Sequence, residues 1–190
     1  MTSRLFSLAA VLAGTLLVGA CGDPVRVDAR SGTFTDTLTA YALTGTPASF
    51  PTALNSYARQ VLRIDGDFAF DVAFDIQPDG KAVIFPVGAI GGSYAVNRRV
   101  GVQLSSSTFE ALVRAPGGTY EYEDALIVTP PAVIALEMTN PAICQFEFSQ
   151  VMYAKVSVDS VKTGTRQLFL RQLIDPNCGF RSLAPGVPRN

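Results

Sequence analysis

The 190-residue sequence contains no histidine, and this absence excludes more functions than any motif suggests. Without histidine there is no Ser-His-Asp or Cys-His nucleophilic machinery, no His-ligated zinc and no His proton shuttle. A Ser-x-x-Lys motif is also missing, which leaves a Ser-Lys hydrolase without its nucleophile and base. The 15 basic and 16 acidic residues give no excess of positive charge, and this argues against nucleic-acid binding.

Long apolar runs are absent except at the N-terminus. A short basic start (1–4) precedes an apolar run (5–18), and small residues follow. This order is typical of a secretory signal, and the run is too short to span a bilayer comfortably. No later apolar stretch approaches the length of a transmembrane helix.

The end of this segment, Leu17-Val18-Gly19-Ala20-Cys21, resembles the lipobox of bacterial lipoproteins. The resemblance implies that Cys21 is lipidated on its sulfur, with palmitate among the fatty acids, and that residues 1–20 are removed. Gly22, rather than Asp, follows the cysteine, which by the same resemblance implies export to the outer membrane, facing the periplasm. The alternative is an ordinary signal peptide in which Cys21 occurs by chance.

We therefore expect three parts: a signal peptide (1–20), a lipidated tether (21–32) and one domain (33–190). The eleven polar residues after Cys21 reach about 37 Å when fully extended, so the domain stays near its membrane. The mature chain is long enough for one ordinary domain with a real core.

Two further cysteines, Cys144 and Cys178, form an even pair in an oxidising compartment. We predict a disulfide between them. Two cysteines without any histidine make a poor zinc site, because structural zinc takes four Cys or His ligands.

The mature sequence is rich in Val, Ile, Phe and Thr, which favours strands over helices. Short apolar or alternating segments separated by Gly, Pro and Asp turns predict roughly nine or ten strands. This pattern indicates an all-β antiparallel sandwich, with an open barrel as the alternative. We expect strands at 33–43, 60–64, 68–76, 81–87, 98–104, 124–128, 132–138, 143–148, 153–161 and 166–174.

Two local predictions are more detailed. Residues 60–87 should form a meander with turns at Asp65-Gly66 and at Pro78-Asp79-Gly80. Alternation over 68–76 places the large apolar side chains on one face and Asp71 and Asp75 on a solvated opposite face. A capping box at Ser107-Thr-Phe-Glu110 predicts one short helix.

Few residues are candidates for ligand binding. Asp65, Asp67 and Asp79 cluster near the two turns of the meander, and calcium takes oxygen ligands, but the Asp-x-Asp-x-Asp-Gly spacing is missing. Arg98 and Arg99 are candidates for an anionic ligand or a lipid head group, although two arginines at a strand start are typical of a solvated edge. The stretch 120–124 (YEYED) is a second acidic cluster. We predict no metal and no cofactor.

These observations favour a membrane-anchored, non-catalytic binding or structural module of the cell envelope. Its expected partners are the membrane, through Cys21, and an envelope protein or glycan. The alternative is a hydrolase that acts on envelope glycan or peptide with carboxylates alone, using Asp71, Asp75 or the stretch 120–124. Asp71 and Asp75 lie four residues apart, about 13 Å along a strand, which exceeds the spacing of glycosidase carboxylates.

Overall fold

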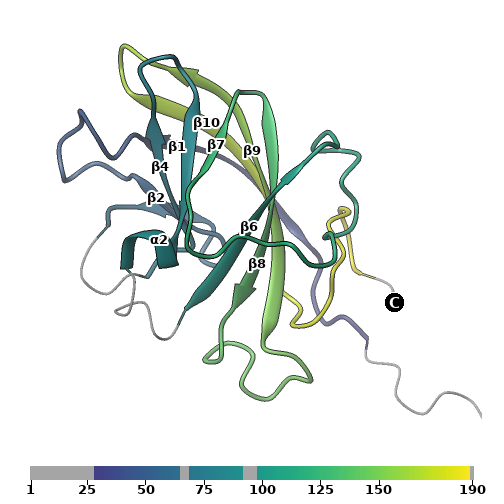
Figure 1. The fold of residues 1–190 in the computed structure, drawn as a ribbon. Coiled ribbons are helices and arrows are strands. Elements are labelled where there is room, and N and C mark those ends of the chain that lie inside the picture. The colour runs from purple at the N-terminus through teal and green to yellow at the C-terminus, as the bar shows by residue number, and fades with distance from the viewer. Residues whose placement is uncertain (1–27, 65–68, 92–97, 189–190) are drawn as a thin grey trace, which may run out of the picture.

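The computed structural model describes residues 28–64, 69–91 and 98–188, and these form two antiparallel β-sheets of five strands each. The sheets pack face to face as a sandwich with one short helix (Figure 1). The all-β sandwich is therefore confirmed over the barrel alternative, because the strands form two separate sheets and not one continuous sheet curled on itself. The elements are β1 (Phe34–Tyr41), β2 (Ala53–Asn55), β3 (Gln60–Leu62), β4 (Val72–Ile76), β5 (Ala82–Pro86), α2 (Val87–Gly91), β6 (Arg99–Ser105), β7 (Leu126–Val128), β8 (Ala132–Thr139), β9 (Val151–Lys162) and β10 (Gln167–Asp175).

The larger sheet, called here the long sheet, has the order β1-β10-β9-β8-β6. Its centre is the hairpin of β9 and β10, which pairs Gln167 with Lys162 at the turn and continues to Asp175 opposite Tyr153. Strand β1 pairs with β10 along its whole length, and β6 with β8. The strands predicted at 33–43, 98–104, 132–138, 153–161 and 166–174 are confirmed.

The second sheet, called here the short sheet, has the order β3-β2-β4-β5-β7. The β4–β5 hairpin is confirmed, with Gly80 in the left-handed region (φ 85°) that its turn requires. The predicted meander is wrong, because β2 lies between β3 and β4 and pairs with both. Strand β2 has only three residues, too few to show an alternation. The predicted Asp65-Gly66 turn lies outside the described residues.

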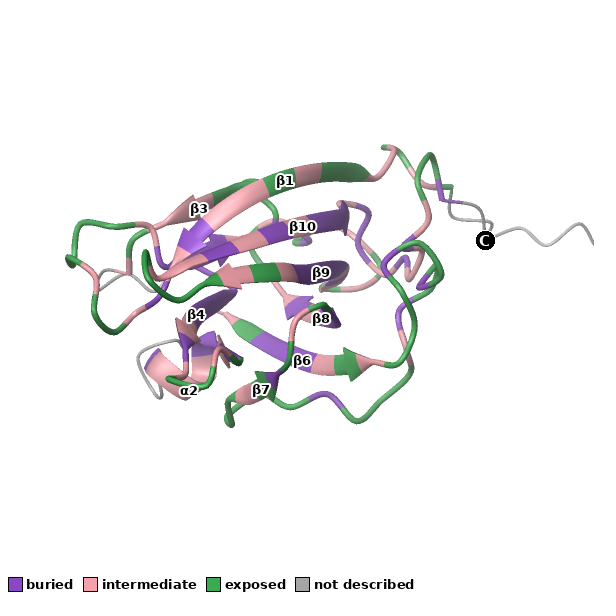
Figure 2. Ribbon diagram, turned by 90° about the horizontal axis from the view of Figure 1, so that it is seen from above, coloured by how far each residue is buried: buried purple, intermediate pink, exposed green. Residues whose placement is uncertain are grey.

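The main core fills the space between the sheets. The apolar residues of the β4 segment point into it as their alternation predicts, and Phe70, Val72 and Phe74 have no exposed surface. Strands β9 and β10 contribute Val156, Val158, Leu168 and Leu170 from the opposite side. Figure 2 shows buried residues along these central strands and exposed residues mainly in β1, the end of β6 and the loops.

A second, smaller core covers the outer face of the long sheet. Segments 106–122 and 179–188 lie over β8 and β10 and are joined by a bridge between Arg114 and Ser182. The cluster consists of Phe109, Leu112, Ala115, Tyr120, Val133, Ala135, Leu173 and Leu183. The C-terminal segment is thus an integral layer of the fold.

The short helix predicted to begin at the Ser107–Glu110 capping box is wrong, although the segment does form a turn. Thr108 caps it instead of Ser107: the Thr108 hydroxyl accepts a hydrogen bond from the Ala111 N–H, and its carbonyl accepts one from Leu112. Glu110 leaves the capping position to pair with Arg171. The helix found among the described residues is α2 (Val87–Gly91), which follows β5 directly.

The predicted disulfide between Cys144 and Cys178 is confirmed, with a Cα–Cα distance of 5.9 Å. The strand predicted at 143–148 is wrong. These residues form turns in the β8–β9 loop, where the Asn140 carbonyl accepts from the Cys144 N–H, and no sheet partner is available. The bond closes a stretch of 34 residues and joins the loop to the chain after β10.

Candidate functional site

A cleft of about 600 Å³ lies where the outer face of the long sheet meets the ends of β6 and β7. Strand β6 is an edge of the long sheet and β7 is an edge of the short sheet, so neither is covered by another strand on its outer side. The turn that follows β6 and the β7–β8 connection form the remaining walls. The residues that define its chemistry are Leu104, Ser105, Glu110, Ile127, Asp159 and Arg171.

Arg171, on β10, organises the polar side of this cleft. Its Nε donates to Asp159 Oδ2 at 2.7 Å, and its Nη1 donates to Glu110 Oε1 at 2.8 Å. Ser157 donates its hydroxyl to Asp159 at 2.6 Å. Residues 157, 159 and 171 share the outer face of the long sheet, because β9 and β10 place them on the same side of the pleat. One guanidinium therefore links two carboxylates.

These contacts set the ionisation of all three groups. The hydrogen bonds to Asp159 and Glu110 raise the pKa of Arg171 above its ordinary value. The hydrogen bond from Arg171 lowers the pKa of Glu110. Burial by itself raises the pKa of Asp159, but the hydrogen bonds from Arg171 and Ser157 outweigh burial and lower that pKa overall. Both carboxylates are thus ionised near neutral pH.

The apolar side of the cleft is formed by two half-exposed aliphatic side chains. Leu104 at the end of β6 and Ile127 in β7 are each 51% exposed. Such aliphatic surface in a concave site is typical of a binding position for another apolar group.

The edge of β6 is closed over part of its length and open beside the cleft. The backbone of Val102 exchanges two hydrogen bonds with Glu121, at 2.8 and 2.9 Å. In an antiparallel strand every second residue points its backbone groups to the same edge, so those of Leu104 point outward as well. They have no strand partner within the described part of the chain. The cleft therefore contains an open strand edge.

A buried lysine supports the turn that forms one wall. Lys155, on β9, is 1% exposed, and its ammonium group donates to the carbonyls of Phe109 and Leu112, the latter at 3.0 Å. It also lies 4.4 Å from the centre of the Phe109 ring. Burial lowers the pKa of Lys155. The long sheet thus fixes the position of the turn through a charge-assisted pair of hydrogen bonds.

Asp71 does not lie on a solvated face as predicted. It is 4% exposed, its Oδ1 is 2.9 Å from Arg98 Nη1, and its Oδ2 accepts a hydrogen bond from the Ser56 N–H. Burial raises the pKa of Asp71, although Arg98 and Ser56 oppose the shift. Arg98 is thus engaged in an internal ion pair, and its role as a contact for an anionic ligand stays a prediction. Arg99 is exposed and stacks on the Tyr122 ring at 3.8 Å.

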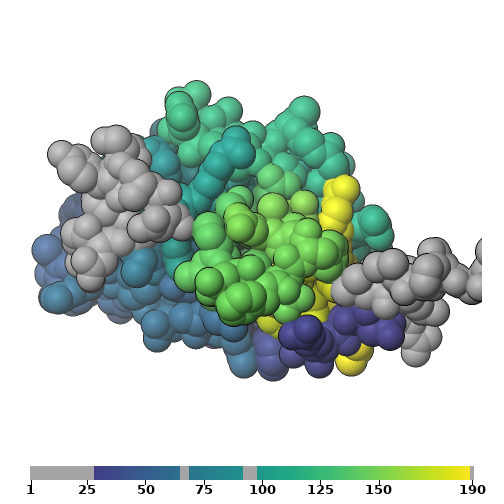
Figure 3. Space-filling view, turned by 90° about the horizontal axis from the view of Figure 1, so that it is seen from below, coloured from purple at the N-terminus to yellow at the C-terminus, as the bar shows by residue number. Residues whose placement is uncertain are grey.

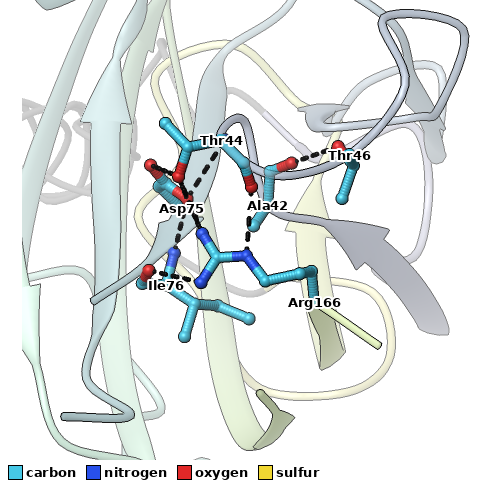
Figure 4. A network of polar contacts seen from close by, with 6 residues as sticks. All are labelled: Ala42, Thr44, Thr46, Asp75, Ile76 and Arg166. Carbon is cyan, nitrogen blue, oxygen red and sulfur yellow. Dashed lines mark hydrogen bonds and ion pairs between the residues drawn. The ribbon is translucent and has the colours of Figure 1, made fainter. Parts of the chain in front are cut away.

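Asp75 was also expected on the solvated face, and it too lies in an internal network (Figure 4). Its Oδ1 accepts from Arg166 Nη2 at 2.7 Å and from the Thr44 hydroxyl at 3.0 Å. Arg166 also donates to the carbonyls of Thr44 and Ile76. Arg166 belongs to the β9–β10 turn and Asp75 to β4, so the network joins the two sheets. Long-range partners of this kind are why the alternation at 68–76 failed to predict the exposure of its carboxylates.

The remaining predicted contacts do not assemble into a site. Asp79 is exposed in the β4–β5 turn and pairs with Lys81 at 2.8 Å, which lowers its pKa. Asp65, Asp67 and Cys21 lie outside the described residues. Within the described ranges, no three His, Cys, Asp or Glu residues are grouped closely enough to hold a metal ion.

The acidic stretch 120–124 serves the second core. Tyr120 is buried there, and burial raises its pKa. Glu121 accepts hydrogen bonds from the backbone N–H groups of residues 123, 124 and 122, which together lower its pKa. Tyr122 donates its hydroxyl to Glu137, and burial raises the pKa of Tyr122 to about 12. These groups stabilise a turn and the layer beneath it.

Sequence reasoning did not identify the residues that form the cleft. A lysine inside the apolar run of β9 (Lys155) was a visible signal, because a buried cation needs acceptors that hold another segment in place. The pairing of Arg171 with Asp159 follows from their facing positions on the last hairpin, but Glu110 is 61 residues away from Arg171 along the chain. Only the folded structure brings the three together.

The chain matches no protein-family model, no curated protein and no solved structure in comparisons with known proteins. No relative therefore assigns a ligand to the cleft, and its chemistry follows from its own residues. Among the described residues, no helix is long and apolar enough to cross a membrane.

Proposed function

We propose that the protein is a lipid-anchored, non-catalytic binding module on the periplasmic side of the outer membrane. In this proposal its cleft holds an extended polypeptide segment of an envelope partner. The observation that carries the proposal is the open edge of β6 at Leu104, beside a concave surface with one apolar and one charged wall.

An extended polypeptide fits this arrangement better than a compact small molecule. The outward backbone groups of Leu104 offer a donor and an acceptor to an added strand. An apolar side chain of that strand would contact Leu104 and Ile127, which are half exposed. A basic side chain would meet Glu110, whose side chain is 71% exposed although it contacts Arg171. Backbone hydrogen bonds would supply affinity and the two walls specificity.

The charges in the cleft support binding over the hydrolase alternative. A carboxylic general acid needs a raised pKa to hold a proton near neutral pH. The hydrogen bond from Arg171 instead lowers the pKa of Glu110, and the pKa of Asp159 is lowered overall against the effect of burial. Burial does raise the pKa of Asp71, but this carboxylate is 4% exposed and paired with Arg98, out of reach of a substrate. Asp75, the other candidate, is paired with Arg166.

The cleft is tested with a photo-crosslinking amino acid introduced at Leu104 or Ile127 in growing cells. Val113 is the matched control, because it is 53% exposed and does not line the cleft. We expect one shared polypeptide adduct from positions 104 and 127 and none from 113, with the adduct lost in an Ile127→Asp variant of the position-104 protein. Equal adducts at all three positions would contradict the assignment of the cleft.

The anchor and the absence of catalysis are tested separately. Cys21→Ser should remove all label from cells fed a radioactive fatty acid, and equal label in the variant would contradict the lipidation of Cys21. Purified protein should not turn over peptidoglycan fragments, esters or peptides. Turnover that disappears in Asp71→Asn or Asp75→Asn would favour the carboxylate hydrolase.

A further inference from the structure

The most exposed large apolar side chain among the described residues is Phe146, in the β8–β9 loop, which is 91% exposed. Phe148, two residues later, is 61% exposed. A phenylalanine ring left in water forgoes the free energy of burial, so two neighbouring exposed rings indicate a contact surface. The loop spans residues 140–150 and lies at the lower end of the sandwich in Figure 1.

This loop is held firmly in place. The Cys144–Cys178 disulfide ties it to the chain after β10, and the Asn140 carbonyl and side chain accept from the N–H groups of Cys144 and Ile143. The Phe148 ring packs edge-on against Phe180 at 6.0 Å and lies directly over Gly179, where any Cβ would collide with it. Phe146 is therefore exposed on a loop whose position is fixed by the disulfide and these contacts.

The segment that leads back to Cys21 lies against the same loop. Asn177 accepts hydrogen bonds from the N–H groups of Arg30 and Ser31 at 2.8 and 3.0 Å and donates to the Ser31 carbonyl. Figure 3 looks at this face and shows the loop in green at its centre, with the described start of the chain in purple beside it. The nine residue steps from Cys21 to Arg30 cannot exceed about 30 Å. A lipid on Cys21 would therefore keep this face close to the bilayer.

The negative charge of Glu147, between the two phenylalanine rings, is paired with Arg30. Glu147 separates Phe146 from Phe148, and its Oε1 lies 3.1 Å from Arg30 Nη1. The Arg30 side chain is 81% exposed and that of Glu147 only 27%, so the cation is the outer partner. This arrangement suits the headgroup region, where basic groups meet lipid phosphates and apolar rings reach the acyl chains.

We infer that the Phe146–Phe148 tip inserts into the lipid surface next to the anchor, so that the domain contacts the membrane at two points. The inference rests on the proposed lipidation of Cys21. Two contacts on one rigid body fix its orientation, whereas a lipid tether alone leaves it free to rotate. The β6–β7 cleft, which lies at the start of β8 rather than at its end, then faces away from the bilayer.

The absence of tryptophan from the sequence gives a direct test. Phe146→Trp introduces a single fluorophore into the full-length lipidated protein, reconstituted into phosphatidylethanolamine–phosphatidylglycerol vesicles. We expect its emission to move to shorter wavelength and to fall about twofold with brominated acyl chains, as for a side chain at the headgroup–acyl boundary. The matched control is Ile127→Trp, half exposed in the cleft, whose emission should not change.

Mass spectrometry of the same samples separates the two proposals. An acylated protein that floats with the vesicles but shows an unquenched Trp at position 146 would overturn insertion and leave the anchor intact. A chain without fatty acid would overturn the anchor. A blue shift that grows with protein concentration in the absence of vesicles would also overturn insertion, because the loop would then contact a second copy of the chain.

Discussion

Asp175 at the end of β10 should make the protein less stable as the pH rises towards neutrality. It has no exposed surface, and its Oδ1 accepts hydrogen bonds from the backbone and side chain of Asn177. Its Oδ2 has no hydrogen-bond partner among the described residues. Burial raises the pKa of Asp175 to about 6 from the ordinary value of 3.8, although the bonds from Asn177 oppose the shift.

The sign and size of the effect follow from proton linkage. Between these two pKa values the folded state holds a proton that the unfolded state has lost, so stability falls as the pH rises. Below pH 3.8 Asp175 does not lower the free energy of unfolding, because it is protonated in both states. Above about pH 6 its ionisation destabilises the folded state to the full extent. A difference of about two pKa units corresponds to roughly 3 kcal/mol in the free energy of unfolding.

Asp175→Asn replaces the carboxylate by a neutral group of the same shape and keeps the acceptor that Asn177 uses. In urea titrations between pH 4 and 7.5, we expect the variant to match the parent near pH 4 and to gain roughly 1 to 3 kcal/mol near pH 7. Asp36→Asn is the opposite control, since the hydrogen bond from Arg59 lowers the pKa of Asp36 and its loss should destabilise most at neutral pH. Equal pH dependence in parent and Asp175→Asn would refute the reasoning.

Two further predictions concern the links that hold the sandwich together. Replacing Cys144 and Cys178 by serine should lower the free energy of unfolding by about 4 kcal/mol, because a 34-residue stretch regains its conformational freedom in the unfolded state. Urea denaturation of parent and variant measures this difference. A loss below about 1 kcal/mol would contradict the prediction. Arg166→Met leaves the half-buried Asp75 carboxylate without its cation and should cost about 2 kcal/mol, seen as a lower urea midpoint at constant slope. An unchanged midpoint would show that Thr44 alone satisfies Asp75.

Local signals in the sequence predicted much of the fold. The alternation at 68–76 and the Pro-Asp-Gly turn specify the β4–β5 hairpin with contacts only a few residues apart. The position of β2 between β3 and β4 was not predictable in this way, because its three residues carry no period and it pairs with β3 along one edge and with β4 along the other. The Ser107–Glu110 capping box failed because Glu110 finds a cation on β10.

The exposure of polar residues was the least predictable property. Asp71 alternates with core residues as a surface carboxylate would, but Ser56 and Arg98 come from two distant segments and cover it. The cleft depends in the same way on pairs far apart in sequence, such as Glu110 with Arg171. The disulfide was predictable because, with Cys21 expected to carry the lipid, only Cys144 and Cys178 of the three cysteines remained to pair.

The pairing of β1 with β10 has a consequence for biogenesis. Phe34 faces Ile174 and Tyr41 faces Gln167, so the first strand of the long sheet cannot pair until the last strand is present. A chain synthesised from its N-terminus presents β1, with its three threonines, long before β10 emerges. Such distant pairing slows folding and leaves an open strand exposed to other chains. Folding is therefore delayed until nearly the whole polypeptide has been made, and truncation before residue 167 would leave β1 without its strand partner.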